Sequence, residues 1–321
     1  MRIPKSISVF SIRVCLSITA VCAASAQPIA YVSNMMGNNI SVVNRSTNVI
    51  LTSIQINAAG LAGLAITPDG SHLYVCEQTK NNVGVISTAT NTVVNTIAVG
   101  KGPVQIAITP NGATAYVSNQ NANTVSVINI ATQSVIATIP VGTKPIGIAV
   151  TRDGSRVLVA NLTSNNISVI STSSNTVTAT WTALAGPNGI AMAPGGNLAY
   201  VANQYANSVS VFNLSSGTIQ STIPGFVAPN TLAVTPNGSQ LYVTNANGGS
   251  VYAVNTSTLQ ITARITTGLL PSSVAISSDG ATAYVPNAYG YSLSEINTAT
   301  NTMMFSLPKV GIYPFSIVLY H

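Results

Sequence analysis

The tract Tyr-Val-Ser-Asn at Tyr31–Asn34 recurs, in altered form, along the whole chain. The position of its tyrosine is occupied by Tyr31, Tyr74, Tyr116, Leu158, Tyr200, Tyr242 and Tyr284, at a first spacing of 43 residues and later spacings of 42. A fixed period of this length is typical of one supersecondary unit copied along a chain. The repeat therefore constrains the architecture more than any other feature of the sequence.

Each copy contains four short apolar segments separated by turn-forming residues. In the copy that starts at Pro103, the segments are Val104–Thr109, Ala115–Ser118, Thr124–Asn129 and Ser134–Ile139. They are rich in Val, Ile, Thr and Tyr, which favours strands, and Pro110-Asn111-Gly112 is typical of a turn between antiparallel strands. Four strands in such a repeat predict one blade of a β-propeller. The third segment has apolar residues on both faces. This agrees with a propeller, because neighbouring blades cover both faces of a blade.

The number of copies and the two ends of the repeat region predict how the ring closes. Seven segments lead into predicted innermost strands, and they start at Gly63, Pro103, Pro145, Pro187, Pro229, Pro271 and Pro314. The region opens with a second-strand motif (Ile29–Asn34) and finishes with a first-strand motif (Phe315–Tyr320). We expect the C-terminal strand to join the three N-terminal strands in one blade, which leaves no open sheet edge at the seam. The prediction is an all-β, seven-bladed propeller of four-stranded antiparallel blades over residues 27–321.

The repeated motifs resemble those of a known family. Tyr-Val-Ser-Asn, the Ser-Val-Ile-Asn of Ser126–Asn129 and the stretch Pro103–Gly112 are similar to the YVTN-type β-propeller repeats of bacterial and archaeal secreted and surface-layer-like proteins. The resemblance covers residues 29–320 and implies the propeller fold. It implies no particular activity, because the family carries no shared catalytic motif and a fold alone does not decide function.

Residues 1–26 have the features of a secretory signal peptide. Positive charge comes from Arg2, Lys5 and Arg13, the apolar stretch is Val14–Cys22, and Ala24-Ser25-Ala26 forms a small-residue cleavage site before Gln27. The apolar stretch is too short to span a bilayer, and we expect no transmembrane segment. We therefore expect an exported protein that is periplasmic, secreted or at the cell surface.

Charge is scarce in the chain. Charged residues make up 5% of it, against about 25% in ordinary soluble proteins. After residue 26, eight Lys and Arg face five Asp and Glu, a net charge of +3, which offers little attraction to nucleic acid. Cys76 is the one cysteine after the signal peptide and has no intramolecular disulfide partner. We expect a monomer whose partner is a protein, a glycan or a component of the cell envelope.

Catalytic and metal sites need converging His, Cys and carboxylate groups, and few are present. After residue 26 they are Asp69, Glu77, Asp153, Asp279, Glu295, His72, His321 and Cys76. The three aspartates occupy the same turn in three blades, so they do not meet in one site. Without a dyad, a triad or a calcium-ligand set, we expect no catalytic residue, metal or cofactor. The chain is therefore expected not to be an enzyme.

Two carboxylates depart from their repeat equivalents. Glu77 stands where the other six copies have Asn, and Glu295 stands where they have Val or Ala. The asparagines at this position form a structural ring. Glu77 is either a neutral substitution in that ring or a charge that orients a ligand. A buried Glu295 would need a partner, and Arg264 of the preceding copy is the candidate unless the carboxylate reaches solvent at the rim.

One side of the propeller offers candidate ligand-binding residues. The connections between second and third strands and between fourth and first strands emerge on the same side, named here the loop face. Its candidates are Glu77, Lys80, Lys101, Lys144, Tyr205, Tyr289, Tyr291 and Lys309. Lysines with aromatic side chains suit sugars, acidic polysaccharides or proteins, although scattered lysines can also serve solubility alone.

The function expected from these observations is that of an exported, non-enzymatic binding or scaffold protein that acts through the loop face. Two alternatives stay open. One is an exported lactonase-like or other propeller enzyme, which polar groups converging in the central channel would support. The other is a structural protein of a surface layer or matrix.

Overall fold

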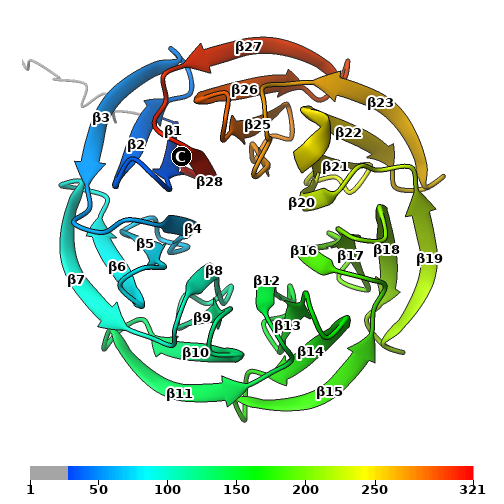
Figure 1. Cartoon of the computed structure of the whole chain (residues 1–321), viewed down its shortest axis with the longest axis horizontal. Helices are drawn as coiled ribbons and strands as arrows, with labels where there is room; N and C mark the ends of the chain where they lie inside the picture. The colour runs from blue at the N-terminus through cyan, green and yellow to red at the C-terminus, as the bar shows by residue number, and fades with distance from the viewer. Residues whose placement is uncertain (1–27, 321) are drawn as a thin grey trace, which may run out of the picture.

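The computed structural model describes residues 28–320. The predicted signal peptide (1–26) and His321 lie outside the described residues. Within them, four-stranded antiparallel sheets form the seven blades of a closed propeller (Figure 1), so the predicted fold is confirmed. No helix in this part of the chain is long and apolar enough to cross a membrane.

Each blade consists of an innermost, a second, a third and an outermost strand. The innermost strands are β28 (Pro314–Tyr320), β4 (Leu61–Ile66), β8 (Pro103–Ile108), β12 (Pro145–Val150), β16 (Pro187–Met192), β20 (Pro229–Val234) and β24 (Ala275–Ile276). The second strands are β1 (Ile29–Asn34), β5 (His72–Glu77), β9 (Thr114–Asn119), β13 (Arg156–Asn161), β17 (Leu198–Asn203), β21 (Gln240–Asn245) and β25 (Thr282–Asn287). The third strands are β2 (Asn39–Asn44), β6 (Asn82–Ser87), β10 (Thr124–Asn129), β14 (Asn166–Ser171), β18 (Ser208–Asn213), β22 (Ser250–Asn255) and β26 (Ser292–Asn297). The outermost strands are β3 (Val49–Gln55), β7 (Thr92–Ala98), β11 (Ser134–Pro140), β15 (Thr176–Thr182), β19 (Thr218–Pro224), β23 (Gln260–Thr266) and β27 (Thr302–Pro308), and a short 3₁₀ helix, η1 (Ala246–Gly248), follows β21.

The ring closes through the C-terminal strand, as predicted. Blade 1 has the order β28-β1-β2-β3, and blades 2 to 7 follow in chain order from β4–β7 to β24–β27. Strand β28 lies antiparallel to β1, with Ile29 opposite Tyr320 and Asn34 opposite Pro314 (Figure 1). Strand β4 starts at Leu61, before the predicted Gly63, because its first residue already pairs with Glu77.

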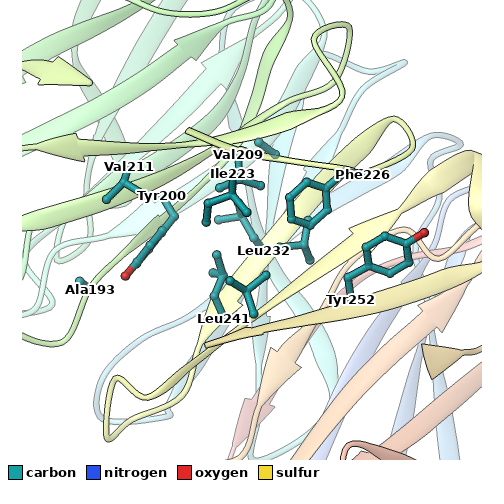
Figure 2. Packing of buried hydrophobic residues seen from close by; sticks show 12 residues of the cluster. Ala193, Tyr200, Val209, Val211, Ile223, Phe226, Leu232, Leu241 and Tyr252 are labelled. Carbon is teal, nitrogen blue, oxygen red and sulfur yellow. The ribbon is translucent and has the colours of Figure 1, made fainter. Parts of the chain in front are cut away.

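The hydrophobic core lies between the blades. The cluster between blades 5 and 6 brings Tyr200 and Val211 of one blade against Leu232, Leu241 and Tyr252 of the next (Figure 2). Burial of each such side chain contributes about 1.5–3 kcal/mol. A comparable cluster joins blade 7 to blade 1 and contains Ile317 of β28, so the seam is packed like the other junctions.

The repeated tyrosine has a structural role. Tyr116 is buried, and its hydroxyl donates a hydrogen bond of 2.7 Å to Asn175 Oδ1 in a turn of the next blade. Tyr31 makes the equivalent contact with Asn91 at 3.4 Å. At these two positions the tyrosine fastens one blade to its neighbour, whereas the buried Tyr74 hydroxyl has no hydrogen-bond partner among the described residues and Leu158 occupies the position by packing alone.

Candidate functional site

The loop face is formed as the sequence predicts. Backbone hydrogen bonds tie each second-to-third connection to the fourth-to-first connection beside it. The Asn121 amide donates to Lys101 O at 3.1 Å, and the Leu162 amide donates to Lys144 O at 3.0 Å. Both kinds of connection therefore lie on one side of the ring.

At this side of the ring, most blades end the second strand with a buried asparagine. Its amide Nδ2 donates to a serine hydroxyl of the third strand. The pairs are Asn34–Ser41 (2.9 Å), Asn119–Ser126 (2.9 Å), Asn161–Ser168 (2.9 Å), Asn203–Ser210 (2.8 Å) and Asn287–Ser294 (2.9 Å). The asparagine ring is therefore structural, because it ties the second strand to the third beside the loops.

Blade 2 replaces both members of this pair at once. Glu77 stands in the asparagine position, and Gly84 stands in the serine position. A Cβ atom at residue 84 would lie 2.6 Å from Glu77 Oε1, closer than real Cβ contacts allow. The glycine thus leaves room for the longer carboxylate, so the two residues fit one another. The break in the serine pattern at Gly84 was the sequence signal for this pair, and sequence reasoning missed it.

The Glu77 carboxylate is buried but faces open space. The residue is 5% exposed, and within residues 28–320 no group donates a hydrogen bond to its carboxylate. It lines a cavity of about 380 Å³ between blades 1 and 2, together with Lys80, Asn57 and Asn82. Burial raises the pKa of Glu77 above its ordinary value, and the positive charge of Lys80 partly opposes this rise. This cavity, named here the Glu77 cavity, is therefore lined by a potential base, a cation and amide groups.

The other predicted site residues lie elsewhere on the loop face. Tyr291 and Lys309 line a second cavity of about 400 Å³ with Gly311 and Ile312. Tyr289 packs edge-to-face against Tyr313, with ring centroids 5.2 Å apart. Tyr205, Lys101 and Lys144 are exposed on three further connections. The structure thus brings together Glu77 with Lys80 and Tyr291 with Lys309, and it distributes the remaining candidates around the ring.

The central channel holds polar groups that the sequence did not reveal. A cavity of about 170 Å³ is lined by Gln105, Asn188, Thr231 and Ser316 of the innermost strands and by Ser273, which precedes β24, among apolar neighbours. Asn188 Nδ2 donates to Asn230 Oδ1 at 2.9 Å. These groups can orient a small polar molecule, but none of them is a base at neutral pH.

Glu295 has a different partner from the one predicted. Its Oε2 accepts a hydrogen bond of 3.3 Å from Asn48 Nδ2, and the charge of Arg45 favours its ionised form. Arg264 instead lies over the ring of Tyr252, 5.0 Å from the centroid. The predicted pairing with Arg264 is wrong because the carboxylate faces blade 1, the following blade, and not the preceding one. Burial raises the pKa of Glu295, and the Asn48 hydrogen bond opposes this rise.

The remaining candidate groups have structural roles. Hydrogen bonds from Thr67 and Ser71 lower the pKa of Asp69 to about 2, and equivalent bonds from Thr151 and Ser155 do the same for Asp153. The Cys76 thiol is buried and unpaired, and burial raises its pKa. Among the described residues, no group of three or more His, Cys, Asp or Glu side chains is placed to hold a metal ion.

Comparisons with known proteins point to an enzyme family. The family model described as "Lactonase, 7-bladed beta-propeller" matches residues 88–183 and 172–278. No curated protein matches the chain significantly.

Solved structures share the fold at low sequence identity. Hydrazine synthase of Kuenenia stuttgartiensis is 22% identical, with a TM-score of 0.79 over 84% of this chain and 92% of that one. A protein of unknown function from Desulfotomaculum acetoxidans DSM 771 is 19% identical, with a TM-score of 0.82 over 91% and 99% of the two chains. A protein proposed to be a 6-phosphogluconolactonase, from Bacteroides fragilis NCTC 9343, is 15% identical, with a TM-score of 0.78 over 93% and 99%. Identities this low show a common fold only.

The match to a lactonase family overturns the expected function. The expectation of a non-enzymatic binding or scaffold protein is wrong, and so is the expectation that the chain is not an enzyme. The lactonase-like alternative agrees better with the family match. Both expectations rested on the lack of converging His and carboxylate side chains in the sequence. Ester hydrolysis can use one base and one cation, and burial can make a single carboxylate basic enough. Burial of this kind is not visible in a sequence.

Proposed function

Because the chain belongs to the lactonase, seven-bladed β-propeller family, we propose that it is an enzyme that hydrolyses a cyclic ester in the Glu77 cavity. The observation that carries this location is the buried Glu77 carboxylate, which has no hydrogen-bond donor within residues 28–320 and lines a cavity with Lys80. A base and a cation beside one cavity can together catalyse hydrolysis of an ester, the base by activating water and the cation by stabilising the oxyanion.

The proposed reaction uses water as the nucleophile. The ionised Glu77 carboxylate removes a proton from a water molecule as the oxygen of that water attacks the lactone carbonyl carbon. The negative charge that develops on the carbonyl oxygen is stabilised by the Lys80 ammonium group. Collapse of the tetrahedral intermediate breaks the ring C–O bond, and the leaving alkoxide takes up the proton held by Glu77. The product is one open-chain hydroxy acid, whose carboxylic proton is released to solvent.

Hydrolysis of lactones by the purified protein tests the proposal. A panel of γ- and δ-lactones assayed in a pH-stat should include at least one that is opened faster than in buffer, because each turnover releases an acid. The rate should rise with pH and then level off, since only the ionised Glu77 can act as the base. The midpoint should lie above the ordinary glutamate value of about 4.3, because burial raises the pKa of Glu77.

Two results would contradict this assignment. If the folded protein opens no lactone in the panel, the proposed activity is contradicted. If hydrolysis is unchanged when Glu77 is replaced, the activity stands but the Glu77 cavity is not its site. The polar central channel around Gln105 and Asn188 would then be the site to test.

We also propose that the enzyme is exported and that its repeats are of the YVTN type. The charged, apolar and small-residue segments of residues 1–26 support export, and the copies of the Tyr31–Asn34 motif support the repeat type. Protein recovered from its native host should begin at Gln27, which N-terminal sequencing measures. A mature chain that still begins at Met1 would contradict export by cleavage.

A further inference from the structure

Charge is divided between the two sides of the propeller. Four exposed lysines lie on the loop face: Lys80, Lys101, Lys144 and Lys309. The exposed carboxylates among residues 28–320 are Asp69, Asp153 and Asp279, and all three lie in first-to-second turns on the opposite side. Glu77, on the loop-face side, is buried. The loop face therefore presents positive charge without exposed negative charge.

The same face carries exposed apolar and aromatic side chains at the tips of its connections. They are Met36, Tyr205, Leu269, Tyr289, Tyr291 and Ile312, with exposed fractions from 47% for Tyr291 to 68% for Leu269. These tips belong to blades 5, 6, 7 and 1, whereas Lys80, Lys101 and Lys144 belong to blades 2, 3 and 4. In the ring of Figure 1, the two groups occupy opposite halves. The apolar and aromatic tips thus gather on one half of the loop face, where Lys309 lies beside Tyr291 and Ile312, and the other three lysines lie on the other half.

Three of these residues have a strained backbone. Tyr291 has φ 50°, Lys144 has φ 56° and Lys309 has φ 57°, all in the left-handed region that favours Gly and Asn. The repeat equivalents of Tyr291 are Asn38, Asn81, Asn123, Asn165, Asn207 and Gly249, which adopt this conformation more easily. The asparagines also help hold the loops, as when Asn123 Oδ1 accepts a 2.8 Å hydrogen bond from the Lys144 amide. Tyr291 has neither the easier backbone conformation of Asn nor the amide side chain that makes this hydrogen bond. Strained residues of this kind cluster where a side chain has a function.

We propose that the loop face docks on an anionic lipid bilayer. Tyrosines are favoured at the membrane interface, aliphatic tips such as Leu269 and Ile312 gain by entering the boundary of the acyl chains, and lysines are attracted to anionic head groups. The absence of exposed carboxylates on this face among the described residues removes the repulsion that would oppose such docking. A hydrated acidic polysaccharide would use the lysines but would leave Leu269, Ile312 and Met36 in water, so it fits the face less well. This docking is independent of the proposed hydrolysis.

Vesicle binding tests the proposal. The purified protein should co-sediment with vesicles of phosphatidylcholine and phosphatidylglycerol in a two-to-one ratio, and much less with phosphatidylcholine alone. Replacing Lys101 and Lys144 by Glu should lower the partition coefficient roughly tenfold or more, because two attractive charges become repulsive. Tyr291→Asn should also lower it, and should raise the melting temperature because the residue usual at this position is restored.

Matched variants separate docking from general effects of charge and hydrophobicity. Arg152→Glu reverses an exposed charge on the opposite side, and Phe305→Ser removes an exposed aromatic from the outermost strand β27; both should bind vesicles as the wild type does. Hydrolysis of a soluble lactone should be unchanged in the Lys101, Lys144 and Tyr291 variants, because these residues do not line the Glu77 cavity. Equal binding by all variants would overturn the proposal. So would binding to an acidic polysaccharide such as alginate without binding to vesicles.

Discussion

Replacing Glu77 by Asn together with Gly84 by Ser is expected to abolish hydrolysis and to stabilise the protein at the same time. The double change restores the pair found in blades 1, 3, 4, 5 and 7, such as Asn119 with Ser126. Loss of the general base should lower the hydrolysis rate about 100-fold or more. Removal of a buried carboxylate without a hydrogen-bond donor, and gain of a hydrogen bond, should raise the melting temperature roughly 2–4 °C. A lactone assay and thermal unfolding measure the two effects.

The gain in stability should depend on pH in a defined direction. The native pKa of Glu77 is raised above its unfolded value, so the native state holds the proton more tightly than the unfolded state does. The wild type therefore loses stability as pH rises from the unfolded pKa, about 4.3, through the higher native pKa. The double variant does not lose stability in this way, because it has no carboxylate at residue 77. The difference in melting temperature between the double variant and the wild type should therefore be larger at pH 7 than at pH 4.

A second buried carboxylate provides the matched control. Glu295→Val also removes a carboxylate whose pKa burial raises, and it restores the residue of five other blades. This variant should leave the hydrolysis rate unchanged, because Glu295 does not line the Glu77 cavity. An equal loss of activity in both variants would show that the Glu77 effect is indirect. A double variant as active as the wild type would remove Glu77 from the mechanism.

The single replacements show whether Glu77 and Gly84 are matched. Gly84→Ser alone should displace the Glu77 carboxylate toward the cavity, because the Cβ atom of the serine would lie 2.6 Å from Glu77 Oε1. Glu77→Asn alone lacks the serine hydroxyl that the other asparagines contact. The free-energy changes should therefore be non-additive by on the order of 1 kcal/mol or more. Additive changes would mean that the two residues vary independently.

Deleting residues 314–321 is expected to abolish cooperative folding. The deletion removes β28, which pairs along the whole of β1 and contributes Ile317 to the cluster between blades 7 and 1. It also removes the hydrogen bond of 3.1 Å from the Ser316 amide to Ser33 Oγ. Several lost apolar contacts of about 1.5–3 kcal/mol each are comparable to the whole stability of a domain, about 5–15 kcal/mol. Calorimetry should show no sharp unfolding transition near that of the wild type.

Adding back the missing strand checks that the loss is specific. A peptide of residues 314–320 should raise the melting temperature of the truncated protein in a concentration-dependent way, because it binds only the folded ring. A scrambled peptide with the same composition should have no effect. A truncated protein with the melting temperature of the wild type would show that the ring does not depend on closure by β28.

The fold of this chain follows from local sequence patterns, whereas its side-chain contacts and its site do not. The blade count, the closure and most strand positions are confirmed because each depends on local patterns that are repeated in register, such as Tyr31–Asn34 and the Pro110–Gly112 turn. The partner of Glu295 was wrong because blade-to-blade contacts depend on the direction in which a side chain leaves its strand. The expected lack of enzymatic function was wrong because it depended on the number of reactive residues, whereas burial, which a sequence does not show, decides how basic a single carboxylate is.

The sequence by itself determined a closed ring of seven blades, since each copy repeats the hydrophobic and turn pattern that builds one sheet and covers both of its faces. It also singled out Glu77 and Glu295 as departures from that pattern. Only the tertiary structure decided what those departures do, because burial and the neighbouring blade determine the chemistry of a carboxylate. Glu295 meets Asn48 across a blade junction, whereas Glu77, given room by Gly84, lies without a hydrogen-bond donor from residues 28–320 beside a cavity.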